Sequence, residues 1–175
     1  SDITSQILSS VVSQDPLDKY NLYYMGDVFK KDIFSLEIKQ FREHGIEVIN
    51  QPKLISFNLI TEILIKYLKL VLKSDFHFVF TDPNLKNNKK FILTKKNNNT
   101  GIQGFVNHFD KNFKNIPYTL NPEKNFFSKD YHQDIFFYVY SNKTKKILSQ
   151  GGGYTYKKNN KTLNGFGFSC NIDDW

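Results

Sequence analysis

Two glutamates stand four residues apart in a stretch that we interpret as a β-strand. Glu43 and Glu47 lie within KQFREHGIEVI, residues 39–49. Side chains at positions i and i+4 of a strand point to the same face, so both carboxylates are placed to contact one cationic ligand. Taken in isolation, the same pair is more typical of a solvated strand face.

A histidine between two carboxylates forms a second candidate group. His132 is flanked by Asp130 and Asp134, and a carboxylate beside an imidazole is a common arrangement in acid–base catalysis. Without further context, a surface histidine explains these residues equally simply. His44, His77, His108 and His132 show no metal-type spacing with each other or with Cys170, so we expect no metal and no other cofactor.

The small residues near the C-terminus favour structural roles. Three glycines at 151–153 are followed by no Gly-Lys-Ser/Thr, so they predict a bend in a sheet and not a phosphate-binding loop. The single cysteine, Cys170, cannot form an internal disulfide, which favours an intracellular, cytoplasmic protein. It lies in an apolar stretch and is expected to be a small buried residue.

The charge is positive but carried almost entirely by lysine. The formal net charge is +7, and of 24 basic residues only Arg42 is an arginine. Lysine and asparagine are abundant throughout, and the densest stretch, 86–100, fits a solvated turn around a short apolar strand. Charge alone says little about specific binding, so we expect no dedicated nucleic-acid patch. The chain also lacks the planar guanidinium groups that clamp a triphosphate.

These candidate residues require a sheet and helices to position them. No apolar run approaches the roughly 20 residues that span a bilayer, and 175 residues are enough for one domain. The pattern predicts an α+β fold, an antiparallel sheet with helices packed on one face. We expect helices at 2–12, 56–73 and 101–115 and strands at 22–29, 39–49, 77–81, 133–140, 146–150 and 165–171, with the glycines interrupting after 150.

Four segments together resemble a known family. They are DIT (2–4), the pair YYMGDVFK (23–30) and KQFREHGIE (39–47), DYH (130–132), and GGGY (151–154) followed by GF (167–168). Their order and spacing resemble the catalytic core of histidyl-tRNA synthetase and its non-catalytic relative, the regulatory subunit of ATP phosphoribosyltransferase. The resemblance implies a single class II aminoacyl-tRNA synthetase-like domain over residues 1–175. We expect this domain to lack the family's motif 1 region at the N-terminus.

The departures from the synthetase pattern concern its arginines. Positions where the resemblance places an arginine hold Lys30, Phe127, Gly153 and Asp174, and Asp173 replaces a glutamate. Adenylate formation gathers negative charge that fixed cations must offset. A carboxylate in place of a cation costs about 4 kcal/mol at a separation of roughly 4 Å, even in a surface-like dielectric. We therefore expect no synthetase activity, and the departures favour the regulatory relative.

The resemblance also implies a site and partners. It places Asp2, Thr4, Glu43, Glu47, Tyr131 and His132 around a histidine-like ligand, and Lys30 and Phe41 at a phosphate and adenine remnant. It implies a regulatory subunit that binds and activates the short ATP phosphoribosyltransferase catalytic subunit in histidine biosynthesis, relays histidine feedback by allostery, and forms a homodimer within a hetero-oligomer. Two alternatives stay open: a fragment of a histidyl-tRNA synthetase, and a basic module that binds RNA or protein.

Overall fold

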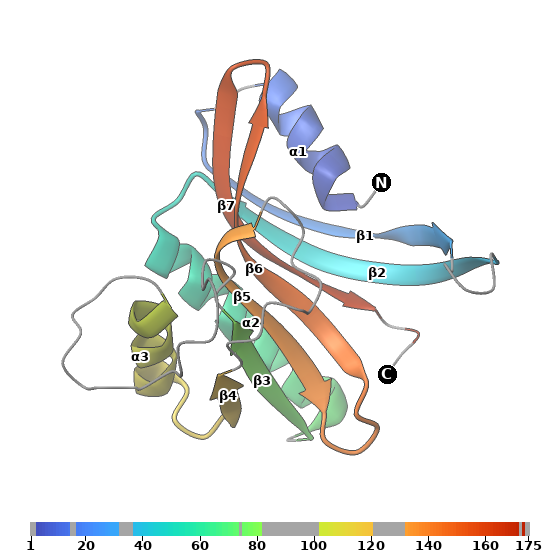
Figure 1. Ribbon diagram of the computed structural model, residues 1–175, viewed down its shortest axis with the longest axis vertical. Helices are drawn as coiled ribbons and strands as arrows, with labels where there is room; N and C mark the ends of the chain where they lie inside the picture. The colour runs from blue at the N-terminus through green and yellow to red at the C-terminus, as the bar shows by residue number, and fades with distance from the viewer. Residues whose placement is uncertain are drawn as a thin grey trace, which may run out of the picture.

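One sheet organises the part of the chain that the structure describes. The computed structural model describes residues 3–14, 17–31, 37–73, 75–81, 102–120, 132–171 and 173. Within these ranges seven strands form a sheet in the order β1-β2-β7-β6-β5-β3-β4, accompanied by three helices (Figure 1). The elements are α1 (Ile3–Ser13), β1 (Tyr20–Lys31), β2 (Ile38–Ile49), α2 (Lys53–Leu72), β3 (Phe76–Thr81), α3 (Ile102–Asn112), β4 (Tyr118–Leu120), β5 (His132–Ser141), β6 (Ile147–Lys158) and β7 (Lys161–Asn171).

The predicted α+β fold is confirmed, with one addition to its sheet. In the order of the sheet, every neighbouring pair of strands from β1 through β2, β7, β6 and β5 to β3 is antiparallel. The short strand β4 pairs in parallel with β3 at the edge. Its three residues are too few to produce an alternating pattern that the sequence could reveal.

The larger core lies between the sheet and α2. Val48 of β2 and Phe166 of β7 point into it, together with Phe78 of β3 and Phe137 of β5. The ring of Phe57 is fully buried among aromatic neighbours, 5.1 Å from the ring of Phe105 between centroids. The apolar stripe of α2 faces this core, which explains why a helical period was readable there.

The opposite face of the sheet packs against α1, which corrects the expectation that the helices share one face. Ile49 follows Val48 in β2 and therefore points the other way, into a second cluster with Leu8 and Val12 of α1. Figure 1 shows α1 in the angle between the β6–β7 hairpin and the β1–β2 hairpin. The apolar pattern of a helix or a strand shows which of its own faces is buried. It does not show which face of the sheet the helix covers.

The three glycines at 151–153 lie inside β6, so the predicted interruption is wrong. β6 runs unbroken from Ile147 to Lys158. A Cβ at Gly151 would lie 2.8 Å from Phe137 Cζ, and one at Gly152 would lie 2.9 Å from Phe136 Cα. The missing side chains thus make room for β5 and its phenylalanines to pack closely against β6.

The hairpin of β6 and β7 is longer than expected, because two asparagines form its turn. Asn159 and Asn160 have φ angles of 49° and 60° and connect β6 to β7, where Lys158 pairs with Lys161. Asparagine is among the residues that adopt this left-handed conformation most readily. The strand β7 therefore begins at Lys161 and not at the predicted residue 165.

Candidate functional site

A buried carboxylate lies on the sheet face that carries α1. Glu47 belongs to β2, the second strand from the β1 edge of the sheet, and only 2% of its surface is exposed. Its Oε1 accepts a hydrogen bond from Thr4 Oγ1 of α1 at 2.8 Å, and its Oε2 accepts one from the Tyr154 hydroxyl of β6 at 2.8 Å. Both oxygens of this buried carboxyl group thus have donors, as the burial of a polar group requires.

Two glycines of β7 create the space for this group. Gly167 pairs with Glu47 across the β2–β7 ladder, and a Cβ built on it would overlap the carboxylate, at 2.6 Å from its Cδ. Gly165 lies two residues earlier, and a Cβ there would lie 2.6 Å from Tyr154 Cζ. The spacing Gly-Phe-Gly therefore leaves room on this face for the Glu47 carboxylate and the Tyr154 ring, while Phe166 and Phe168 fill the core behind it.

Further polar residues extend from Glu47 along β2 and the C-terminal half of β7. Glu43 is half-buried, and the Tyr24 hydroxyl lies 3.5 Å from its Oε1. Gly45 leaves room for the Tyr24 ring, which a Cβ on that glycine would meet. Asn171 pairs with Glu43 across the β2–β7 ladder, and Ser169 pairs with Gly45. These polar residues share the face of Glu47, so the two glutamates are four residues apart on one polar surface.

Several predicted site residues meet here. Thr4 and Glu47 are in direct contact, and His132 pairs with Tyr154 at the backbone of the β5–β6 ladder. Phe41 lies two residues from Glu43 on the same strand face, and Lys30 pairs with Lys39 farther along the hairpin. The side chains of Lys30 and His132, and the whole of Asp2 and Tyr131, lie outside the described residues.

Residues that sequence reasoning did not assign to the site include Tyr154, Tyr24 and Asn171. Tyr154 was noticed only as the last residue of GGGY, yet its hydroxyl is a partner of Glu47. The feature that identifies Tyr154 is a tyrosine on the polar face of one strand, paired with a glycine of the neighbouring strand. The pairing of Tyr154 with Gly165 is visible only once the register of β6 and β7 is known.

The positions where the resemblance places an arginine do not all face Glu47. Gly153 pairs with Phe166, whose ring is in the core behind the sheet, so position 153 faces away from Glu47. This corrects the expectation that an arginine lost at 153 bears on the pocket. Asp173 accepts a hydrogen bond from the backbone N–H of Arg42 at 2.8 Å, while Phe127 and Asp174 lie outside the described residues.

The chain's single arginine does not serve this site. Arg42 is exposed and its Nε lies 3.5 Å from Asp27 Oδ1. It stands between Phe41 and Glu43 in β2, so its side chain points to the face opposite to theirs. No arginine is therefore available on the Glu47 face, because the sequence contains no other.

Two further properties concern metals and membranes. In the ranges that the structure describes, no three His, Cys, Asp or Glu side chains gather closely enough to hold a metal ion. Among the same residues, no helix has the length and apolar character needed to cross a bilayer. The Glu47 face itself presents carboxylates, hydroxyls and an amide, groups that form hydrogen bonds and charge pairs.

No protein-family model matches the sequence, and neither does any curated protein. Solved structures do match over nearly the whole chain. A chain in the ATP phosphoribosyl transferase (HisG:HisZ) complex from Thermotoga maritima is 12% identical with a TM-score of 0.74, and the match covers 98% of this chain and 80% of that one. An ATP phosphoribosyltransferase regulatory subunit/histidyl-tRNA synthetase from Bacillus halodurans C is 15% identical with a TM-score of 0.72, over 98% and 62% of the two chains.

A synthetase shares the fold over a smaller part of its length. The apo histidyl-tRNA synthetase of S. aureus is 18% identical with a TM-score of 0.65, and the match covers 99% of this chain and 49% of the synthetase. The chain thus spans about half the length of that enzyme. At these identities the likeness establishes the fold, a class II histidyl-tRNA synthetase-like core, and the expected resemblance is confirmed at that level.

Proposed function

We propose that this chain is a non-catalytic regulatory subunit, which binds and activates a short ATP phosphoribosyltransferase catalytic subunit in histidine biosynthesis. The observation that carries the proposal is the match to a chain in the HisG:HisZ complex, which has a TM-score of 0.74. The TM-score for the S. aureus synthetase is 0.65.

The chemistry of the Glu47 face supports a role in binding and not in adenylate formation. Glu43 and Glu47 are anionic groups on a face without arginine. Joining a carboxylate to the α-phosphate of ATP would bring further negative charge to this face, where fixed cations are needed to stabilise the transition state. Carboxylates repel phosphates instead, so ATP activation is disfavoured here.

The same carboxylates suit a small cationic ligand, and free histidine is our candidate. Its ammonium can pair with Glu43, which is half-buried and thus reachable from solvent. Glu47 is sealed by Thr4 and Tyr154, so it acts on the ligand through these hydroxyls or after α1 has moved. Feedback through α1 would be allosteric if histidine bound more tightly to one position of the helix than to the other.

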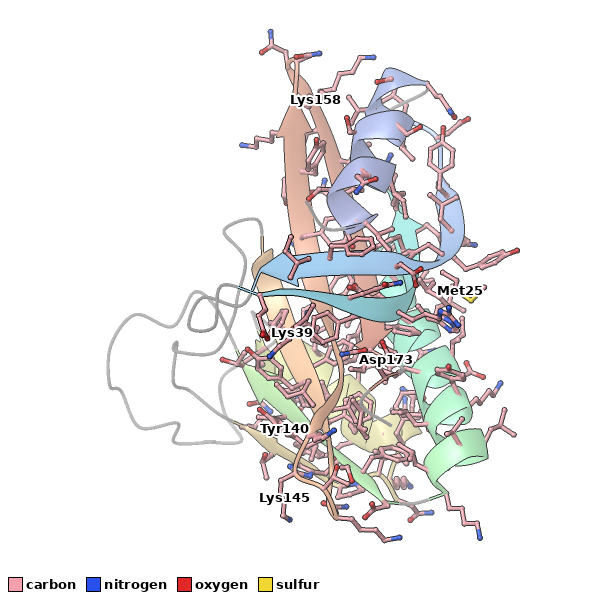
Figure 2. All side chains as sticks on the ribbon, turned by 90° about the vertical axis from the view of Figure 1, so that its right-hand side faces the viewer. Met25, Lys39, Tyr140, Lys145, Lys158 and Asp173 are labelled. Carbon is pink, nitrogen blue, oxygen red and sulfur yellow. The ribbon has the colours of Figure 1, made fainter. Side chains whose placement is uncertain are left out.

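An exposed apolar strip on β1 supports a role in assembly. Tyr23, Met25 and Phe29 are 87%, 69% and 64% exposed, on the face of this edge strand turned away from Glu47. Figure 2 shows Met25 at the surface near α2. Asp27 separates Phe29 from Tyr23 and Met25 on this face. Exposed apolar side chains close together mark protein interfaces, and aromatic residues and methionine are enriched there. We assign this strip to the contact with the catalytic subunit.

Co-purification tests the proposed function directly. The chain, expressed with a short ATP phosphoribosyltransferase catalytic subunit, should co-elute from a sizing column and raise its activity. Tyr23→Ser with Met25→Ser should weaken the complex. The matched control is Leu70→Ser with Val71→Ser, which removes two exposed apolar residues of α2. Failure to co-elute would overturn the regulatory assignment.

Two ligand experiments separate the alternatives. Calorimetry should detect histidine binding, with weaker binding by the Glu43→Gln variant, and no heat at millimolar histidine would remove the ligand from the proposal. Histidine-dependent exchange between ATP and pyrophosphate should be absent. Exchange at a rate above background would instead identify part of a working synthetase.

A further inference from the structure

The turn between β5 and β6 presents lysines at the end of the molecule away from Glu47. Lys143, Lys145 and Lys146 are all exposed in residues 141–146, which we call the basic turn. Figure 2 shows Lys145 and Tyr140 at one end of the molecule and Lys158 at the other. The basic turn is therefore a surface separate from the site described above.

The backbone of the basic turn is held in place by hydrogen bonds. Ser141 N–H donates to Lys146 O and Lys145 N–H donates to Ser141 O, each at 3.0 Å. Thr144 N–H donates to Ser141 Oγ at 3.1 Å, and this hydroxyl donates to Asp75 Oδ2 at 3.1 Å. The lysines thus project from an ordered backbone, so a partner can bind without the entropy cost of ordering this turn.

The charge around the turn is unbalanced. Asp75, the acidic residue that hydrogen bonds place at the turn, already has a donor in Ser141. Lys73, just after α2, lies two residues before Asp75, whose carbonyl oxygen accepts a hydrogen bond from Asn142 N–H of the basic turn at 3.2 Å. Neither Lys73, Lys143 nor Lys145 forms an ion pair within the described residues, whereas Lys66 pairs with Glu62 at 2.6 Å.

A stacked pair of rings lies beside these lysines. The His77 and Tyr140 rings have centroids 5.7 Å apart and an interplanar angle of 20°, and both residues are half-buried. His77 Nδ1 lies 3.0 Å from Asn142 Oδ1 in the basic turn, so the pair is tied to the lysines. Tyr138 supports Tyr140 from within the sheet, at 6.1 Å between centroids.

We propose that this end of the molecule binds single-stranded nucleic acid, with phosphates on Lys73, Lys143 and Lys145 and a base against the His77–Tyr140 pair. Aromatic rings beside a positive surface are the usual means of binding single strands without sequence preference. An acidic polypeptide would use the lysines but has no planar base for the rings, so the rings favour nucleic acid. Net charge did not favour such a site, but the placement of rings beside an ordered lysine turn does.

Fluorescence anisotropy of the full chain with a labelled 12-nucleotide single-stranded RNA tests the proposal. Three phosphate contacts predict that log K falls with log salt at a slope of about −2, and Lys143→Gln with Lys145→Gln should reduce this slope to about −0.7. Tyr140→Leu should weaken binding roughly tenfold at constant salt, because a stacked base is lost.

The controls separate a local site from general charge and from an acidic partner. Lys19→Gln with Lys157→Gln removes the same charge from two exposed lysines elsewhere, and should leave affinity and slope close to wild type. Equal weakening by both lysine pairs would overturn the site. Displacement of the RNA by polyglutamate at equal charge concentration, or no effect of Tyr140→Leu in a variant with unchanged melting temperature, would overturn the assignment to nucleic acid. The proposal is independent of the regulatory function.

Discussion

The hydrogen bond between Tyr154 and Glu47 should be a major local contribution to stability. Tyr154→Phe removes one hydroxyl from a carboxylate that is 2% exposed and keeps the ring over Gly165. Hydrogen bonds to charged groups contribute about 1.5–3 kcal/mol. We expect a loss of about 2 kcal/mol in the free energy of unfolding, or roughly 4–8 °C in melting temperature for a chain of this size.

A double-mutant cycle isolates this interaction. Glu47→Met keeps a side chain of similar length but leaves the Tyr154 hydroxyl without its acceptor, at a cost of about 1–3 kcal/mol. In the double variant both partners are apolar and that cost disappears. The double variant should therefore be more stable than the sum of the single effects by about 2 kcal/mol, measured by urea unfolding.

The matched control is a tyrosine of the same strand. Tyr156 lies two residues from Tyr154 in β6 and is half-buried. Tyr156→Phe should change stability by less than about 0.5 kcal/mol. If the Glu47 and Tyr154 changes were additive within about 0.5 kcal/mol, or if Tyr156→Phe cost as much as Tyr154→Phe, the hydrogen bond would not be what stabilises this face.

Gly167→Ala should lower the urea midpoint strongly, because its Cβ would lie 2.7 Å from the backbone oxygen of Ile46 and would also displace the Glu47 carboxylate, and a midpoint close to wild type would contradict the close packing there. Phe57→Ala should cost about 3–5 kcal/mol in the same assay, since the ring is fully buried, and a loss below about 1 kcal/mol would contradict its place in the core. Burial raises the pKa of the Cys170 thiol from 9.0 to about 12, so the unfolded state loses its proton first as pH rises. Wild type should therefore lose stability relative to Cys170→Ala by about 1.4 kcal/mol per pH unit between those two values and not below them, and a pH-independent difference would refute this.

The elements with a regular apolar period were predictable from sequence. The helix expected at 56–73 is α2, Lys53–Leu72, and the strand expected at 39–49 is β2, Ile38–Ile49. In both, one buried face imposes the period on the sequence. The strand through the glycines at 151–153 was not predictable, because it forms there through the packing of Phe136 and Phe137 from β5.

The site was predictable in its parts but not in its connections. Thr4 and Glu47 were proposed from a resemblance, and they prove to be in contact. The contact of Glu47 with Tyr154 depends on β7 lying between β2 and β6. Sheet order is set by long-range packing, which the spacing of residues along the chain does not encode. The roles of the site residues in ligand binding stay a prediction.

The position of β7 has a consequence for folding. This last strand joins the β1–β2 hairpin to the remaining strands, so the two parts of the sheet share no other ladder in the described chain. During synthesis, the second neighbour of β2 exists only once residues 161–171 have been made. Until that point Glu47 is exposed to water. Pairing over such sequence distances slows folding. We therefore expect the carboxylate to be desolvated late in folding, when its tyrosine partner arrives on the same hairpin as β7.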